Sequence, residues 1–367
     1  MLIGVASADY LRADNSASGL EMWGGSGWAR VGQYVEHIRA AGHKVVCGIA
    51  WNQDHKQLSI EDSEHIHHYP DVIILQRIMH DGLAATIKAA RGNGQVVIND
   101  LDDWYWGLDP SNQAFNASHP KINHQENTRF YASTLAASSL LTVSTPYLRD
   151  RISQRVKCPM VILPNYVDIT RFTPVVQSES PPVYGWAGST LHRSGDIETL
   201  RGVIKPFVTS GRIKIHHSGD LAGAPSFAEG IGLDPAQVST SERVQFFDYP
   251  KMLTFDVGLV PLRDTPFNHA KSDIKGLEYA ASGIPFIAQA LSPYQELLTQ
   301  WSPDPGFYIA KRSSNWIKGI QNMIDYETRL KAQATVLERV KQRDIAYGVK
   351  AWLDLLGSVV DKGPLRL

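Results

Sequence analysis

The chain is poor in cysteine: Cys47 and Cys158 are the only two among its 367 residues. Two thiols are too few for a disulfide framework or a cysteine-based zinc site. No apolar run approaches the roughly 20 residues that cross a bilayer. The opening "MLIGVASADY" also lacks the charged and long apolar segments of a secretory leader. Together these absences predict a cytoplasmic protein without stable membrane insertion.

The chain also lacks an excess of charge of either sign. Its 36 basic residues nearly balance 37 acidic ones, giving a formal net charge of −1. A polybasic surface for nucleic acid or anionic lipid is therefore not expected, although a local basic cleft stays compatible with this balance. The length exceeds that of one ordinary hydrophobic core and suits two domains.

Short apolar runs alternate with helical patterns along the first half. The spacing of Val31, Tyr34, Val35 and Ile38 predicts an amphipathic helix. The predicted strands around it are "LIGVA", "KVVCGIA", "DVIILQRI", "QVVIND" and "LLTVST". Strands that alternate with helices indicate an α/β fold, in which a doubly wound parallel sheet is covered on both faces.

The pattern stops at residues 173–182, a segment rich in Pro and Ser that we interpret as a linker. A second α/β unit follows. Its predicted strands are "PVYGWAG", "IKIHHSG", "VQFFDY", "VGLVPL" and "PFIAQ". A helix over residues 273–282 is predicted between the last two strands, because Gly283 and Pro285 end it.

The stretch "PFNHAKSDIKGLEYAASGIP" places charge on an otherwise apolar helix, with Lys271, Lys275 and Glu278 at i, i+4 and i+7. Ser272 is the expected N-cap, with Asp273 in the first turn. The free N–H groups of a helix start and a nearby lysine suit a pyrophosphate, and a glutamate two turns on suits sugar hydroxyls. The alternative is a solvated face with an ion pair between Lys275 and Glu278.

The longer run "FDVGLVPLRDTPFNHAKSDIKGLEYAASGIPFIA" resembles the nucleotide-sugar site of GT-B glycosyltransferases of the group-one type, family four. In this resemblance, Glu278 matches the second acid of the Glu-x7-Glu motif, which binds the ribose. Ala270 stands where the first acid is usual, so the sequence departs from the common pattern. The form "FNxxKSxxKxxEY" resembles a variant branch in which Asn268, Lys271 and nearby backbone N–H groups hold the donor.

Two glycine-containing loops extend the resemblance. "GWAGSTLHRSGD" resembles the first strand and loop of the C-terminal domain, which gives a basic residue to the diphosphate. His192 and Arg193 are the candidates for that residue, and Gly188 and Ser189 for backbone and hydroxyl donors. A His-Arg pair in a loop is otherwise an ordinary surface feature.

The loop "GGSGW" resembles the family's N-terminal glycine-rich loop, where Gly24 and Gly25 would let backbone approach the donor phosphates or the acceptor. It is not a dinucleotide fingerprint, because the third glycine is missing. "PNYVDITRF" resembles a signature that closes the N-terminal domain, and its Asn165 and Asp168 are expected to be structural.

Three closely spaced acids directly precede three aromatic residues in "NDLDDWYWGLDP". Asp100, Asp102 and Asp103 are similar to the metal-binding Asp-x-Asp motif of a different fold, GT-A, but we expect no metal here. The stretch follows a strand, where open α/β sheets place ligands. Asp102 or Asp103 is therefore a candidate to orient an acceptor hydroxyl. Trp104 and Trp106 either stack on a sugar or base or pack beneath a loop.

As a whole, the resemblance implies two Rossmann-like domains facing a cleft: residues 1–172 for the acceptor and residues 183–344 for the donor. A C-terminal helix at about residues 345–367 would rejoin the first domain. The implied reaction moves a sugar from a UDP- or GDP-sugar to a hydroxyl, with retention and without metal or cofactor. Lys271, His192 and Arg193 would stabilise the diphosphate, helped by Ser272 and Lys275.

Two other functions stay open on the sequence. An epimerase or hydrolase on the same fold would consume a nucleotide sugar without acceptor, using the acids of residues 100–103. A non-catalytic nucleotide-sugar binder is suggested by the missing acid at Ala270. The acceptor is a polysaccharide, a protein or a modified DNA base, and the compact N-terminal half suits a bacterial or phage enzyme. The near-neutral charge disfavours duplex DNA, which usually meets a basic face.

Overall fold

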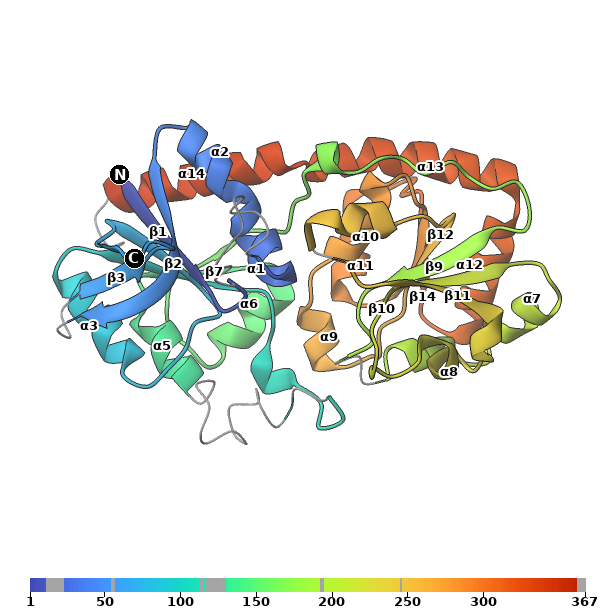
Figure 1. The fold of residues 1–367 in the computed structure, drawn as a ribbon, viewed down its shortest axis with the longest axis horizontal. Coiled ribbons are helices and arrows are strands. Elements are labelled where there is room, and N and C mark those ends of the chain that lie inside the picture. The colour runs from blue at the N-terminus through green and yellow to red at the C-terminus, as the bar shows by residue number, and fades with distance from the viewer. Residues whose placement is uncertain are drawn as a thin grey trace.

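A computed structural model describes residues 1–10, 23–53, 57–112, 115, 130–191, 195–244 and 246–361. Two β-sheets lie side by side, each with helices on both faces (Figure 1). We call the sheet of strands β1 to β8 with its helices the N-terminal unit, and the sheet of β9 to β14 with its helices the C-terminal unit. The α/β architecture expected from the alternating pattern is confirmed.

The N-terminal sheet has eight strands in the order β4-β3-β2-β1-β5-β6-β7-β8. All neighbours pair in parallel except at the edge, where β3 is antiparallel to both β2 and β4. The strands are β1 (Leu2–Ser7), β2 (Lys44–Gln53), β3 (Gln57–Glu61), β4 (His67–His68), β5 (Val72–Gln76), β6 (Val96–Leu101), β7 (Leu140–Val143) and β8 (Met160–Ile162). The strand order reverses between β1 and β5, which creates a crevice at the carboxyl ends of these strands.

The C-terminal sheet has six parallel strands in the order β11-β10-β9-β12-β13-β14, and its order reverses between β9 and β12. The strands are β9 (Val183–Ala187), β10 (Lys214–Asp220), β11 (Val238–Glu242), β12 (Val257–Val260), β13 (Phe286–Gln289) and β14 (Tyr308–Ala310). The predicted strand "VQFFDY" was wrong: this segment enters the 3-10 helix η8 (Phe246–Met252). Pro250 cannot donate a ladder hydrogen bond, and β11 directly precedes the segment.

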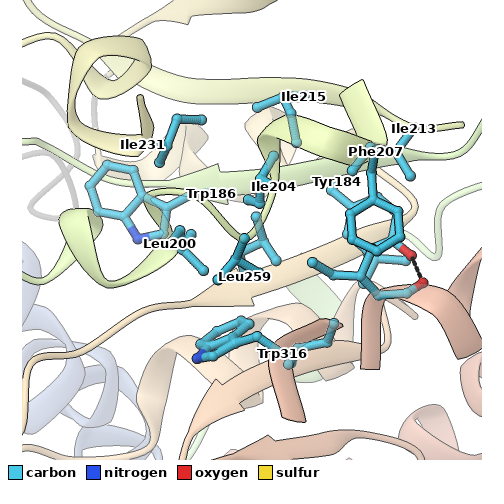
Figure 2. Close-up of a cluster of buried hydrophobic side chains, with 14 of the residues drawn as sticks. Tyr184, Trp186, Leu200, Ile204, Phe207, Ile213, Ile215, Ile231, Leu259 and Trp316 are labelled. Atoms are coloured by element: carbon cyan, nitrogen blue, oxygen red, sulfur yellow. Dashed lines mark hydrogen bonds between the residues drawn. The ribbon is translucent and has the colours of Figure 1, made fainter. Parts of the chain in front are cut away.

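Helices cover both sheets. The main ones are α1 (Gly25–Arg30), α2 (Val35–Ala40), α3 (Leu83–Gly92), α5 (Tyr131–Ala137), α6 (Pro146–Ser153), α7 (Lys205–Thr209), α8 (Phe227–Ile231), α9 (Pro266–Ala270), α10 (Ile274–Ala281), α11 (Ser292–Gln300), α12 (Ser313–Ile324), α13 (Tyr326–Val340) and α14 (Ile345–Asp361). Figure 2 shows how α12 packs on the C-terminal sheet: Trp316 lies beneath Leu259, and the Tyr184 hydroxyl donates to the Ile320 carbonyl at 2.8 Å.

The chain passes between the two units twice, and the two passages lie together. The first follows β8, and the second joins α13 to α14. The Val167 N–H donates to the Arg343 carbonyl at 3.0 Å, and the Ile345 N–H donates to the Val167 carbonyl at 2.8 Å. Helix α14 then runs over the N-terminal unit (Figure 1), where Trp352 and Leu356 join the core around Ile3.

Arg329 fixes the chain that leads into the C-terminal unit. Its side chain is completely buried on α13. The guanidinium donates to the Gln177 side chain at 3.2 Å, to the Met323 carbonyl at 2.9 Å and to the Ile324 carbonyl at 2.6 Å, and it also reaches the Ser178 carbonyl. One cation thus satisfies buried acceptors from the linker and from the turn between α12 and α13.

We expect Arg329→Met to destabilise the protein strongly, because it leaves several buried carbonyls unsatisfied at about 1–3 kcal/mol each. The urea midpoint of unfolding measures the effect. Lys331→Met is the matched control, since Lys331 is exposed on the same helix and should change stability by no more than about 0.5 kcal/mol. Equal midpoints for the two variants would contradict this role of Arg329.

Candidate active site between the two sheets

The charged stretch identified in the sequence forms two helices rather than one. Thr265 caps α9 by accepting from the Asn268 N–H at 3.2 Å, and α9 ends at Lys271, whose ψ is 163°. Helix α10 starts only at Ile274. Lys271 therefore does not lie on the same helix as Glu278, and the predicted i, i+4, i+7 face was wrong.

The predicted cap of α10 was also wrong. Asp273, not Ser272, occupies the N-cap position, and its side chain makes no capping hydrogen bond. The Asp273 carboxylate instead accepts two hydrogen bonds from Arg343, at 2.9 and 3.1 Å. The N-cap residue of α10 thus leaves the first backbone N–H groups of the helix uncapped by its own side chain, with Lys271 and Ser272 immediately before it.

Glu278 lines a pocket that is open to solvent and drawn from both units. Trp28 of α1 contributes one wall, while Arg171 and Tyr249 contribute others. Burial raises the pKa of Glu278, and Lys275, a hydrogen bond from Tyr249 and Arg171 partly oppose this shift. A half-buried carboxyl in a mixed aromatic and cationic pocket is suited to accept hydrogen bonds from vicinal hydroxyls.

Arg171 closes one side of this pocket by touching both units. Its guanidinium lies 4.8 Å from the ring centre of Trp28 and 4.9 Å from that of Phe247, and it donates to the Phe247 carbonyl at 3.0 Å. The cation is therefore stacked between an N-terminal and a C-terminal aromatic ring.

Lys275 points from α10 to the end of β9. Its ammonium donates to the Ala187 carbonyl and lies 5.6 Å from the ring centre of Trp186. This half-buried contact differs from the solvated helix face that the alternative interpretation expected. The next residue, Gly188, has a φ of +141°, and its carbonyl would lie 2.9 Å from a Cβ at Gly219, so the two backbones can approach only without side chains.

Of the other residues proposed to hold the donor, Ser189 and Asn268 make hydrogen bonds within the C-terminal unit, and two more lie outside the described residues. Ser189 accepts from the Leu191 N–H at 3.2 Å. Asn268 is buried, and its amide donates to Asp196 at 2.6 Å and to the Arg263 carbonyl at 2.9 Å, so it braces the loop before α9. Two residues proposed for the diphosphate lie outside the described residues: His192 and Arg193.

The glycine-rich loop of the N-terminal unit is held by Asp9. The Gly24 N–H donates to the Asp9 carbonyl at 2.8 Å, and the Asp9 carboxylate accepts from the Gly27 N–H at 3.1 Å and from the Ser26 hydroxyl at 2.5 Å. The Asp9 carboxylate thus lies at the first turn of α1, and Gly25 beside it is exposed.

Arg77 was missed in the sequence, although it lies near the end of the predicted strand "DVIILQRI" and directly follows β5. Its φ of +59° is unusual for a residue with a side chain and is typical of strained functional positions. Its guanidinium pairs with Asp9 at 2.9 Å. Burial alone would lower the pKa of Arg77, but Tyr105 and the carboxylates of Asp102 and Asp9 raise it. The sequence signal available for Arg77 was its position at the carboxyl end of a predicted strand, beside the point where the strand order reverses.

Asp102 and Asp103 follow β6 and lie near Arg77, whose pKa both carboxylates raise. Burial, and then repulsion from Asp103, raise the pKa of Asp102 to about 7, while Arg77 and Arg30 oppose the shift. Asp103 faces the other unit, with its Oδ1 3.5 Å from the ammonium of Lys271. The Lys271–Asp103 ion pair is only partly buried, and its N–O distance is long. Both side chains are therefore accessible to a ligand between the sheets.

The aromatic residues of this stretch pack within the N-terminal unit. Trp104 is buried, and the guanidinium of Arg151 lies 5.4 Å from its ring centre. Trp106 packs on Tyr131, with ring centres 4.5 Å apart, and Arg155 covers its other side at 5.4 Å. Of the two interpretations left open, these contacts favour packing beneath a loop.

Asp100 is not available to a metal, because Arg30 donates to both of its carboxylate oxygens at 2.9 and 2.7 Å and Thr142 donates at 2.7 Å. Within the described ranges, no three His, Cys, Asp or Glu residues are placed to share a metal ion. The same part of the chain contains no helix with the length and apolar character to cross a membrane.

We expect Asp102→Asn to stabilise the protein more at about pH 8 than at about pH 5. Asp102 has a raised pKa in the folded state, so its ionisation costs stability as the pH rises from its unfolded value near 4 towards about 7. The amide removes that cost. Thermal unfolding at both pH values measures the difference, with exposed Asp354→Asn as control. The same gain in Tm at both pH values would contradict this cause.

Solved structures match almost the whole chain, although no protein-family model and no curated protein matches it. Sucrose-phosphate synthase from Thermosynechococcus elongatus aligns over 98% of this chain and 99% of its own, with a TM-score of 0.64 and 15% identity. Anabaena HepE in complex with UDP aligns over 97% and 99%, with a TM-score of 0.61 and 13% identity. The pneumococcal O-GlcNAc transferase GtfA, in complex with UDP and GlcNAc, aligns over 85% and 69%, with a TM-score of 0.53 and 11% identity.

Likeness at such low identity establishes the fold and not the activity. In this chain the fold consists of two sheets, a reversal of strand order in each, and a second chain passage that returns α14 to the first sheet. The GT-B fold expected from the motifs is confirmed, and this chain has the two-unit GT-B architecture of these glycosyltransferase structures.

Proposed function

We propose that this protein is a glycosyltransferase that moves a sugar from a nucleotide-sugar donor, a UDP-sugar in the first instance, to an acceptor hydroxyl. The observation that carries the proposal is the arrangement around α10. Glu278 faces a pocket between the units, while Lys271 and Ser272 stand before a helix start that its N-cap side chain, Asp273, does not cap. The fold agrees with this, and two structures that share it contain UDP.

The nucleoside would bind in the Glu278 pocket. An ionised Glu278 accepts hydrogen bonds from both ribose hydroxyls, and the cations Lys275 and Arg171 favour that ionised form against the effect of burial. Tyr249 and Trp28 supply aromatic surface for the base. The pocket therefore recognises the nucleoside without needing the sugar.

The diphosphate would lie between α10 and the turn after β9. The N-terminus of α10 directs backbone N–H groups at an anion, and Lys271 adds a full positive charge. Gly188 leaves this turn without a Cβ, although its N–H already donates to the Ser218 carbonyl at 2.8 Å, and Ser189, His192 and Arg193 belong to the same loop. These donors would stabilise the charge that develops on the departing nucleoside diphosphate, the largest contribution to catalysis in such a reaction.

The acceptor would enter on the side of Arg77, Asp102 and Asp103, opposite Lys271. Asp103 would orient the acceptor hydroxyl, and the leaving diphosphate would take its proton on the same face, which retains the anomeric configuration. The protein then contributes positioning and charge stabilisation. No metal or cofactor takes part in this scheme. A polysaccharide, a protein and a modified DNA base stay as acceptor classes.

We expect the protein to release UDP from a UDP-sugar only when an acceptor is present, and equally in EDTA. The test incubates a panel of UDP- and GDP-sugars with polysaccharide, protein and DNA fractions, and follows UDP or GDP release and acceptor mass. Lys271→Met should lower turnover by at least about 100-fold, because it removes a charge that stabilises the transition state.

The same panel separates the alternatives. Donor consumption without acceptor would identify a hydrolase or epimerase, binding without turnover would identify a non-catalytic binder, and activity lost in EDTA and restored by manganese would overturn metal independence.

We expect Glu278→Gln to weaken UDP binding by about 10- to 100-fold, because hydrogen bonds to a charged acceptor contribute about 1.5–3 kcal/mol. The isosteric amide keeps the volume but loses the charge. Isothermal calorimetry with UDP measures the loss. Glu296→Gln, at another half-buried glutamate of the same unit, serves as control and should bind as the wild type does. An unchanged affinity in Glu278→Gln would remove Glu278 from the donor site.

A further inference from the structure

Asn165 lies at the first chain passage between the units and contacts groups from both. It is 2% exposed. Its side-chain oxygen accepts from Arg30 at 2.7 Å, its side-chain nitrogen donates to the Ser272 hydroxyl at 2.7 Å, and its main-chain carbonyl accepts from Arg343 at 2.6 and 3.1 Å. Each polar atom of the Asn165 side chain therefore has a partner, one in each unit.

The orientation of the Asn165 amide is determined by its neighbours. A guanidinium only donates hydrogen bonds, so the amide oxygen must face Arg30 and the NH₂ group must face Ser272. Arg30 cannot turn away, because Asp100 accepts from it twice and the Leu163 carbonyl accepts at 2.7 Å. An unpaired buried cation or amide would be costly, so the network holds one arrangement.

This arrangement determines what Ser272 can do. Its oxygen accepts from Asn165, which leaves its hydroxyl proton to donate elsewhere. Within the described part of the chain, Ser272 makes no other hydrogen bond. Ser272 follows Lys271 and directly precedes Asp273, the N-cap of α10, whose side chain does not cap the helix. The free proton of the Ser272 hydroxyl is therefore presented where an anion would be held.

We propose that Asn165 is a positioning residue that holds the Ser272 hydroxyl as a hydrogen-bond donor to the phosphate groups of the nucleotide. This inference rests on the proposed donor site and assigns a role to a residue outside it. Asn165 itself does not touch the ligand. Because the buried Arg30–Asp100 pair in the N-terminal unit fixes the Asn165 amide, it also fixes the orientation of the Ser272 hydroxyl in the C-terminal unit.

The decisive variants reverse or remove the hydrogen bond that the Asn165 amide donates to the Ser272 hydroxyl. Asn165→Asp keeps the shape and the contact with Arg30, but its carboxylate can only accept, so the Ser272 proton turns towards residue 165 and away from the phosphate. Asn165→Ala removes the donor without adding charge. Ser272→Ala removes the hydroxyl, and Ser272→Thr retains it as the matched control.

Calorimetry with UDP and with uridine distinguishes positioning from a general structural role. We expect Ser272→Ala and Asn165→Asp each to weaken UDP binding about tenfold, and Asn165→Ala to weaken it less, while uridine binding stays near wild type in all three and Tm stays near wild type in Ser272→Ala. Ser272→Thr should bind UDP as the wild type does. The Asn165→Asp, Ser272→Ala double variant should lose much less than the product of the single losses, because both act through one hydroxyl.

Three outcomes would overturn the proposal. Unchanged UDP affinity in Ser272→Ala would show that the hydroxyl does not contact phosphate. Equal losses for UDP and uridine in the Asn165 variants would show a structural role only. Multiplicative losses in the double variant would show that Asn165→Asp acts by its charge alone. Wild-type protein that binds neither UDP nor GDP would instead overturn the proposed function together with this inference.

Discussion

Two buried guanidinium–carboxylate pairs meet at Asn165: Arg30 with Asp100, and Arg343 with Asp273. Together they hold the two sheets in a fixed relative position. Charges taken out of water are stable only when their partners and hydrogen bonds are complete, so such pairs tolerate little displacement. Asp100 ends a strand of the first sheet, and Asp273 begins α10 in the second. These two pairs and Asn165 therefore connect the first sheet to the start of α10.

The α/β alternation was predictable because parallel strands buried on both faces appear as continuous apolar runs. The break between α9 and α10 was not. Local sequence favours a cap at Ser272, but Asp273 pairs with Arg343, 70 residues away, and this contact sets where the helix starts. Likewise "VQFFDY" has strand-like composition, and only the placement of β11 before it shows that the position in the sheet is taken.

The same distinction explains which site residues the sequence revealed. Glu278 and Lys271 belong to one short motif and were found from it. Arg30 and Asp100 are also 70 residues apart, and Asn165 and Ser272 are 107 apart. Such pairs form only once the sheets have folded, so no spacing of residues in the sequence predicts them. The roles of all these residues in catalysis stay predictions.

The return of α14 to the first sheet has a consequence for how the protein is made. Trp352, Leu356 and Val359 complete a core whose other members include Ile3 and Val5 of β1. A ribosome delivers the chain from its N-terminus, so this core stays open while the entire C-terminal unit is translated. The first unit emerges first but is finished last, and its exposed apolar surface must be protected throughout synthesis.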